Sequence, residues 1–147
     1  MRSAVVLLLS AASVLAGCGT GEKPVLDELS ACANIHFAET PHVVTEHRAA
    51  DFGAGRTLSV VVDVPPEPTQ TFEQLSGLGP FTPGVPDEWR SERWMDESLT
   101  AALRTDTGNT RFSDYHPPFP ARWVVVHDSG AGQRRIFVKA YCEGDAR

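Results

Sequence analysis

The stretch that decides the fold is residues 123–142, WVVVHDSGAGQRRIFVKAYC. Two runs rich in β-branched and aromatic residues, 123–127 and 135–142, flank a polar turn that contains two glycines. Such a pattern is typical of a β-hairpin. Alternate residues of the second run share one face of a strand; they are Ile136, Val138, Ala140 and Cys142. The sequence therefore predicts a C-terminal β-hairpin in which Cys142 faces the core.

A further strand and a helix are expected earlier in the chain. Residues 56–64 alternate apolar with more polar side chains, which is the clearest single-strand pattern in the sequence. Residues 25–33 follow Pro24, a favourable first-turn residue, and place apolar side chains at helical spacing. Cys32 would lie on the inner face of this helix. One or two short strands are also expected between residues 35 and 44.

The middle of the chain predicts helices separated by long loops. A short helix is expected from about Thr71 to just before Gly77, and a longer one over residues 88–104. The segments 77–86 and 105–120, rich in glycine and proline, are expected to be loops. The fold class is therefore α+β: one small domain with a mainly antiparallel sheet of four or five strands and two or three helices.

Composition limits the class of partner. The chain has 147 residues, enough for one domain with its own core, and 41% hydrophobic with 22% charged residues is an ordinary globular composition. Nineteen acidic residues oppose thirteen basic ones, for a formal net charge of −6. Nucleic-acid binding requires clustered Lys and Arg, and the adjacent pair Arg134 and Arg135 forms no such patch. No nucleic-acid partner is expected.

The beginning of the chain has the features of an export signal. Residues 4–15 are apolar apart from Ser10 and Ser13. A helix of that length would rise only about 18 Å, too little to span a hydrocarbon core of roughly 30 Å. The run ends in Leu15-Ala16-Gly17-Cys18, which resembles the lipobox of bacterial lipoproteins.

The resemblance implies an address and a modification. Residues 1–17 would be a signal peptide, and Cys18 would receive a diacylglyceryl group and become the first residue of the mature protein. Residues 18–24 would form the lipidated cysteine and a tether, and residues 25–147 an α+β domain on the extracytoplasmic face of the cell membrane. Membrane lipid would then be a partner through acylated Cys18, since two or three acyl chains give lasting attachment. The alternative is a chance cysteine near a non-lipid cleavage site.

The layout of the whole chain is also similar to a group of proteins. Arginine outnumbers lysine by 11 to 2, a bias that GC-rich codons produce. A leader, a short tether and one α+β domain closed by a hairpin resemble the small lipoproteins of actinobacteria, which have no common assigned activity. This resemblance therefore implies no active-site residues.

Export also bears on the other two cysteines. Disulfides persist outside the cytoplasm. With Cys18 assigned to lipid, Cys32 and Cys142 remain, and an even remainder favours a disulfide between them. The alternative is two buried free thiols.

Aromatic residues beside the two long loops are the best candidates for ligand binding. Tryptophan and tyrosine are enriched at binding hot spots, and planar rings can stack on a sugar or hold a peptide. The candidates are Trp89, Trp94, Tyr115 and Trp123. The alternative is that these rings form a second core beneath the loops.

Other constellations are weaker. The densest group of possible metal ligands is formed by His36, Glu39, His42, Glu46, His47 and Asp51. The spacing of five between His42 and His47 fits neither a helix nor a strand. Ser129 lies in a turn sequence and lacks the glycine two places before it that a nucleophile elbow needs. We therefore expect solvated histidines, no catalytic serine, no bound metal and no cofactor.

The function expected from the sequence is a non-catalytic, membrane-anchored module that binds an envelope protein or glycan. One alternative is an extracytoplasmic hydrolase of envelope material that uses His and Asp from the loops; it requires titratable groups converging in a cleft. Another is capture of a metal or small solute, which requires His36, His42 and His47 to meet in space.

Overall fold

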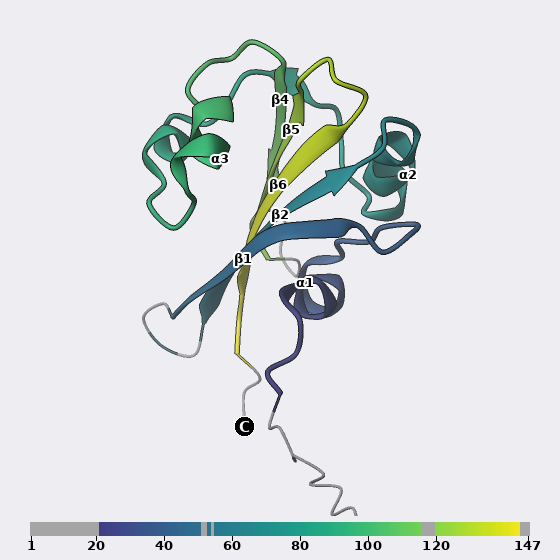
Figure 1. The fold of residues 1–147 in the computed structure, drawn as a ribbon. Helices are drawn as coiled ribbons and strands as arrows, with labels where there is room; N and C mark the ends of the chain where they lie inside the picture. Colours follow the sequence, from purple (N-terminus) through teal and green to yellow (C-terminus); the bar gives the residue numbers. More distant parts are fainter. Residues whose placement is uncertain (1–20, 51–52, 54, 116–119, 145–147) are drawn as a thin grey trace, which may run out of the picture.

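A six-stranded antiparallel sheet is the frame of the protein in the computed structural model, which describes residues 21–50, 53, 55–115 and 120–144 (Figure 1). The strand order is β1-β2-β6-β5-β4-β3. The strands are β1 His42–Ala50, β2 Arg56–Val64, β3 Thr82–Pro83, β4 Asn109–Asp114, β5 Arg122–Asp128 and β6 Arg134–Cys142. An antiparallel sheet combined with three helices confirms the α+β class. Helices cover both faces of the sheet, so the domain has three layers.

The predicted C-terminal hairpin is present and central. β5 and β6 pair in antiparallel register, with Val124 opposite Val138 and Val126 opposite Ile136. β6 also pairs along its whole length with β2. The two longest apolar strands therefore lie side by side in the middle of the sheet, where both faces are buried and β-branched side chains pack well.

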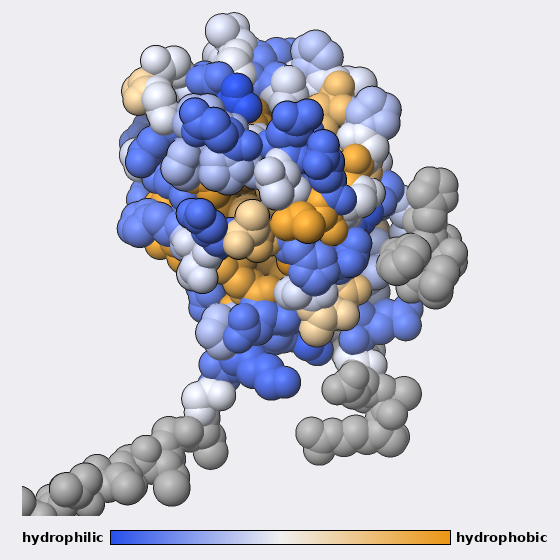
Figure 2. Space-filling model, turned by 90° about the vertical axis from the view of Figure 1, so that its right-hand side faces the viewer, coloured by the Kyte–Doolittle hydropathy of each residue, from blue (hydrophilic) through white to orange (hydrophobic). Residues whose placement is uncertain are grey.

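One face of the sheet carries the larger core. Helices α1 (Val25–Ala33) and α2 (Glu67–Leu75) cover this face. Alternate residues of the central strands point into it, including Val60, Val138 and Cys142. Figure 2 shows this side of the molecule, where hydrophobic residues reach the surface between hydrophilic ones. The partly buried hydrophobic residues of this core are Leu26, Cys32, Phe37, Leu78, Phe81 and Phe112.

The opposite face carries a second, smaller core. A 3₁₀ helix, η1 (Asp87–Ser91), and helix α3 (Glu97–Ala102) lie over it. Its buried members are Val61, Val85, Trp89, Met95, Leu99, Leu103, Val125 and Phe137.

The prediction of one continuous helix over residues 88–104 is wrong, because this segment forms two separate helices. Trp89 and Met95 are both buried in the second core, although six residues apart they would lie on different sides of one helix. The chain therefore breaks after η1 and starts again at Asp96, whose side chain accepts a hydrogen bond from Leu99 N at 3.0 Å and caps α3.

Three other local predictions need correction. The segment 105–120, expected to be a loop, contains β4, which lacks an apolar strand pattern because all but one of its residues are polar and half of them are exposed. The short helix near Thr71 begins earlier, at Glu67, with a proline in its first turn. The early strands are a single strand, β1, and residues 35–37 belong to none. The sheet accordingly has six strands rather than four or five, β3 and β4 both coming from expected loops.

Candidate functional site

The start of the described chain is held against β1. Arg48 forms an ion pair with Glu22 at 3.6 Å and donates a hydrogen bond to the carbonyl oxygen of Lys23. Glu46 accepts a hydrogen bond from Val25 N at 3.3 Å. We call these contacts the tether clamp, because they fix the chain where the predicted tether enters the domain.

The predicted lipidation site cannot be placed beside the clamp. Cys18 and the predicted signal peptide, residues 1–17, lie outside the described residues. The last part of the predicted tether, Glu22 to Pro24, is described and leads directly into α1.

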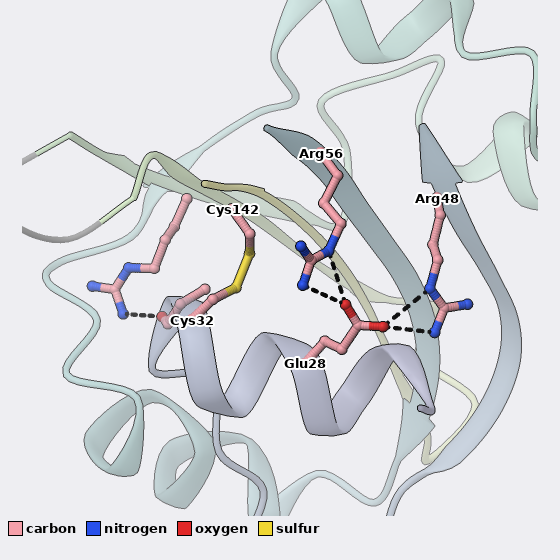
Figure 3. Close-up of a disulfide and its surroundings, with 7 residues drawn as sticks. Glu28, Cys32, Arg48, Arg56 and Cys142 are labelled. Carbon is pink, nitrogen blue, oxygen red and sulfur yellow. Dashed lines mark hydrogen bonds and ion pairs between the residues drawn. A yellow bond between two sulfur atoms is a disulfide. The ribbon is translucent and has the colours of Figure 1, made fainter. Parts of the chain in front are cut away.

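Cys32 and Cys142 form a disulfide. It joins the last turn of α1 to the end of β6 across 110 residues of sequence, with a Cα–Cα distance of 5.9 Å. Figure 3 shows that Glu28, one turn earlier on α1, lies between Arg48 of β1 and Arg56 of β2. The N-terminal helix is thus fastened to three strands, by one covalent bond and two ion pairs.

The predicted aromatic residues lie mainly in the second core. Trp89 is buried, with 3% of its surface exposed, while Trp94 and Trp123 are half-buried and pack against the same core. Tyr115, directly after β4, is 71% exposed and belongs to neither core. The structure therefore brings the three tryptophans together over one sheet face but leaves Tyr115 outside that group.

A row of register partners, which includes Trp123, crosses the sheet beneath Trp89 and Trp94. Ser113, Trp123, Lys139, Ser59 and His47 face one another in turn across β4, β5, β6, β2 and β1. Partners in register share a face of the sheet.

Ring and charge contacts fill the space above this row. The Lys139 ammonium lies 5.3 Å from the centre of the Trp89 ring and pairs with Glu92. Burial lowers the pKa of Lys139. At the end of the row, His47 stacks on Trp94 with ring centres 5.5 Å apart.

Trp123 also lines a broad hollow in the surface, which we call the Trp123 groove. It has a volume of about 520 Å³. Glu88, Arg111, Thr82 and Ser113 line the groove together with Trp123. Pro80, Pro86 and Phe112 complete the lining. The sequence did not predict Arg111 and Ser113 as site residues, because they join Trp123 only when β4 is recognised as a strand beside β5, and Glu88 joins them from η1.

A second row of register partners is polar from end to end. Asn109, His127, Arg135, Asp63 and His42 face one another across β4, β5, β6, β2 and β1. Arg135 donates two hydrogen bonds to the Asp63 carboxylate, at 2.7 and 2.8 Å. Titratable groups from four strands thus converge along this polar row.

The polar row borders a pocket of about 210 Å³, which we call the His127 pocket. Asp63, His127 and Arg135 line it from the sheet. Ser98 and Ala102 line it from α3, and Ser129 and Gln133 from the β5–β6 turn. In that turn Asp128 accepts a hydrogen bond from Gly130 N, and Gly130 has a positive φ of 74°. Ser129 thus sits in a turn, as its sequence indicates.

Three pKa values in the pocket depart from their usual range, and that of Arg135 is raised, chiefly by its hydrogen bonds to Asp63. The hydrogen bonds from Arg135 lower the pKa of Asp63, against a smaller opposing effect of burial. Burial lowers the pKa of His127, and the nearby positive charge of Arg135 lowers it further, while Asp128 acts in the opposite direction. His127 is therefore favoured in its neutral form.

The three histidines considered as metal ligands lie apart and have separate partners. His36 contacts Ser30 Oγ at 3.0 Å and Asn34 Oδ1 at 2.9 Å, beside α1. His47 stacks on Trp94, on the other side of the sheet, and His42 faces Asp63. Within the part of the chain that the structure describes, no three His, Cys, Asp or Glu side chains are grouped closely enough to hold a metal ion.

Among the described residues, no helix is both long enough and apolar enough to cross a membrane. No protein-family model, curated protein or solved structure matches the chain.

Proposed function

We propose that this protein is a lipoprotein, held at the extracytoplasmic face of the cell membrane by acylated Cys18, whose domain binds a glycan of the cell envelope in the Trp123 groove. The address is supported by the lipobox Leu15-Ala16-Gly17-Cys18. It is also supported by the Cys32–Cys142 disulfide, because such bonds persist in exported proteins and this pairing leaves Cys18 as the one cysteine for lipid.

The observation that carries the binding proposal is the position of Trp123. Its half-buried ring lies at the edge of a broad groove and is fixed from behind by the second core. A sugar ring has an apolar face of C–H bonds and an edge of hydroxyls. A fixed indole can stack on the apolar face of the sugar. The Glu88 carboxylate and the Arg111 guanidinium can form hydrogen bonds with its hydroxyls.

A glycan fits the groove better than a folded protein does. Stable protein interfaces bury roughly 800 Å² per partner around a desolvated apolar centre. The Trp123 groove instead combines two flat rings, those of Trp123 and Phe112, with charged and hydroxyl-bearing residues and two prolines. This mixture suits a narrow, polar chain with alternating apolar faces.

Binding is tested by co-sedimentation of the processed protein with purified insoluble envelope polysaccharide. Trp123→Ala and Arg111→Ala should each release most of the protein into the supernatant. Arg111 is exposed, so its replacement tests binding without disturbing the core. Tyr115→Ala is the matched control, since Tyr115 is an exposed aromatic residue that does not line the groove. Equal sedimentation of all four proteins would reject the groove as the glycan site.

The address is tested separately by metabolic labelling with a fatty acid analogue and by membrane fractionation. The wild-type chain should carry label and sediment with membranes, and Cys18→Ser should carry none. An unlabelled wild-type chain would reject the lipid anchor without bearing on the groove.

A further inference from the structure

The His127 pocket contains an imidazole whose hydrogen-bonding state is determined by its neighbours. Asn109, which is 3% exposed, donates through Nδ2 to the carbonyl oxygens of Ala102 at 2.7 Å and Thr105 at 2.8 Å. Both partners are acceptors, so the nitrogen of the amide must point toward them. The oxygen, Oδ1, is then the atom that lies 2.9 Å from His127 Nδ1.

This orientation decides which ring nitrogen carries the proton. An amide oxygen can only accept, so Nδ1 of His127 must donate. In the neutral ring the other nitrogen, Nε2, is then an acceptor. Among the described residues, Nε2 has no hydrogen-bond partner, and His127 lines the pocket. The pocket thus presents an acceptor held in place by a buried amide.

The groups around His127 Nε2 determine which kind of ligand the pocket can bind. Arg135 uses Nε and one Nη2 hydrogen for Asp63, so its other N–H groups are donors that the described side chains do not occupy. Ser129 and Gln133 add a hydroxyl and an amide at the rim. A ligand must therefore donate to Nε2 and accept from its other neighbours, and a hydroxyl group does both.

The charges around the pocket disfavour an anionic ligand. Asp63 neutralises Arg135 within the pocket, and Asp128 and Asp96 act electrostatically on His127 and Arg135 from nearby. A carboxylate or phosphate would be repelled by these aspartates, and among the described residues the pocket has no group of His, Cys, Asp or Glu side chains close enough to hold a metal ion. The volume of about 210 Å³ corresponds to roughly seven water molecules at about 30 Å³ each, the size of one small organic molecule.

We infer that the His127 pocket is a binding site for a small neutral polyol, such as a single sugar unit, which donates a hydroxyl hydrogen bond to His127 Nε2 and accepts one from Arg135. The site is separate from the Trp123 groove: the two hollows share no lining residue. It does not depend on the glycan proposal.

The test uses NMR of the processed protein with ¹⁵N-labelled histidine and methyl glucoside as the neutral probe. In the free protein, His127 should carry its proton on Nδ1, with a pyridine-type Nε2 signal. Methyl glucoside should shift that Nε2 signal saturably, and inorganic phosphate at the same concentration should not. A proton on Nε2 in the free protein, a shift that does not saturate, or an equal shift with phosphate would each overturn the inference.

Variants locate the site and separate it from a structural role. His127→Leu should weaken methyl glucoside binding, followed through the backbone amides of the β5–β6 turn, at least tenfold, equivalent to about 1.4 kcal/mol. Trp123→Ala should leave the His127 shift unchanged, even where it abolishes sedimentation with polysaccharide. Unchanged affinity in His127→Leu, or loss of the His127 shift in Trp123→Ala, would contradict a separate site. A purely structural histidine would change stability alone.

Discussion

Arg122 and Asp114 face each other across β4 and β5, joined by two hydrogen bonds of 3.0 and 2.6 Å. The remaining terminal nitrogen of Arg122 donates to the carbonyl oxygens of Ala33 and Ser76, at 3.2 and 2.8 Å. These carbonyls lie at the C-terminal ends of α1 and α2, where a positive charge is favourable. One guanidinium, 6% exposed, thus joins two helices to the sheet.

Arg122→Met should lower the free energy of unfolding by about 2–4 kcal/mol, because it leaves the half-buried Asp114 carboxylate and two carbonyl oxygens without their donor. Urea denaturation measures the change. Arg93→Met is the control: Arg93 is exposed, and its replacement should cost about 0.5 kcal/mol or less. Equal stability of the two variants would contradict a structural role for the Arg122 contacts.

Reduction of Cys32–Cys142 should destabilise the domain by up to about 4–5 kcal/mol, the chain-entropy value for a loop of this length. Thermal unfolding with and without reductant measures the loss, and intact mass should rise by two hydrogens on reduction. The double variant Cys32→Ala, Cys142→Ala should unfold at the same temperature with or without reductant. If the wild-type midpoint does not respond to reductant, the bond does not contribute to stability.

Glu28→Gln should cost about 1–3 kcal/mol at neutral pH, since its carboxylate accepts hydrogen bonds from both Arg48 and Arg56. Burial alone would raise the pKa of Glu28, but the hydrogen bonds and charges of the two arginines outweigh it and lower the pKa. The carboxylate therefore stabilises the fold above its unfolded pKa of 4.5, and this advantage is lost as the pH falls through the lower folded value.

The corresponding measurement is the stability difference between wild type and Glu28→Gln at pH 7 and at progressively lower pH. The difference should shrink toward zero in acid. Glu39→Gln provides the control, because Glu39 is exposed and makes no ion pair in the described structure. A gap that stays constant with pH would show that the two arginines do not act on Glu28 through its charge.

His127 should make stability depend on pH near neutrality. Its folded pKa is lowered from 6.5 by burial and by Arg135, so the unfolded chain takes up the proton more readily. Its contribution is therefore full above pH 6.5 and is lost as the pH falls through the folded value. The groups that face it are Arg135, Asp128 and Asn109.

The difference in unfolding free energy between wild type and His127→Gln isolates this effect, because the other histidines titrate in both proteins. Wild type should lose stability relative to the variant when the pH is lowered from 7.5 to 5. A difference that does not change over this interval would mean that the folded and unfolded pKa values of His127 are equal.

The elements that the sequence predicts well are those whose patterns reflect burial. The sequence predicts β2 and β6 because apolar residues occupy or alternate along these strands. It predicts α1 because the apolar residues of that segment recur at helical spacing. β4 is polar on most positions, and its place in the sheet depends on pairing with β5. Its strand character therefore comes from a neighbour rather than from its own residues.

The same reason explains which parts of the candidate sites were found. Cys32 and Cys142 could be paired by counting cysteines, and Trp123 could be selected by residue type. The contact between Asn109 and His127 depends on the register of β4 against β5, and the two residues are 18 apart in sequence.

The tether clamp has a consequence for how far the protein can reach. Glu22 is held to Arg48, and only three residues separate it from Cys18. At no more than about 3.6 Å per residue, the anchor and the clamp are at most about 14 Å apart. If Cys18 is attached to lipid as proposed, the domain stays close to the lipid headgroups, separated from them by only a few layers of water. A partner must then come to the bilayer surface, and capture depends on two-dimensional diffusion in the membrane more than on movement of the domain itself.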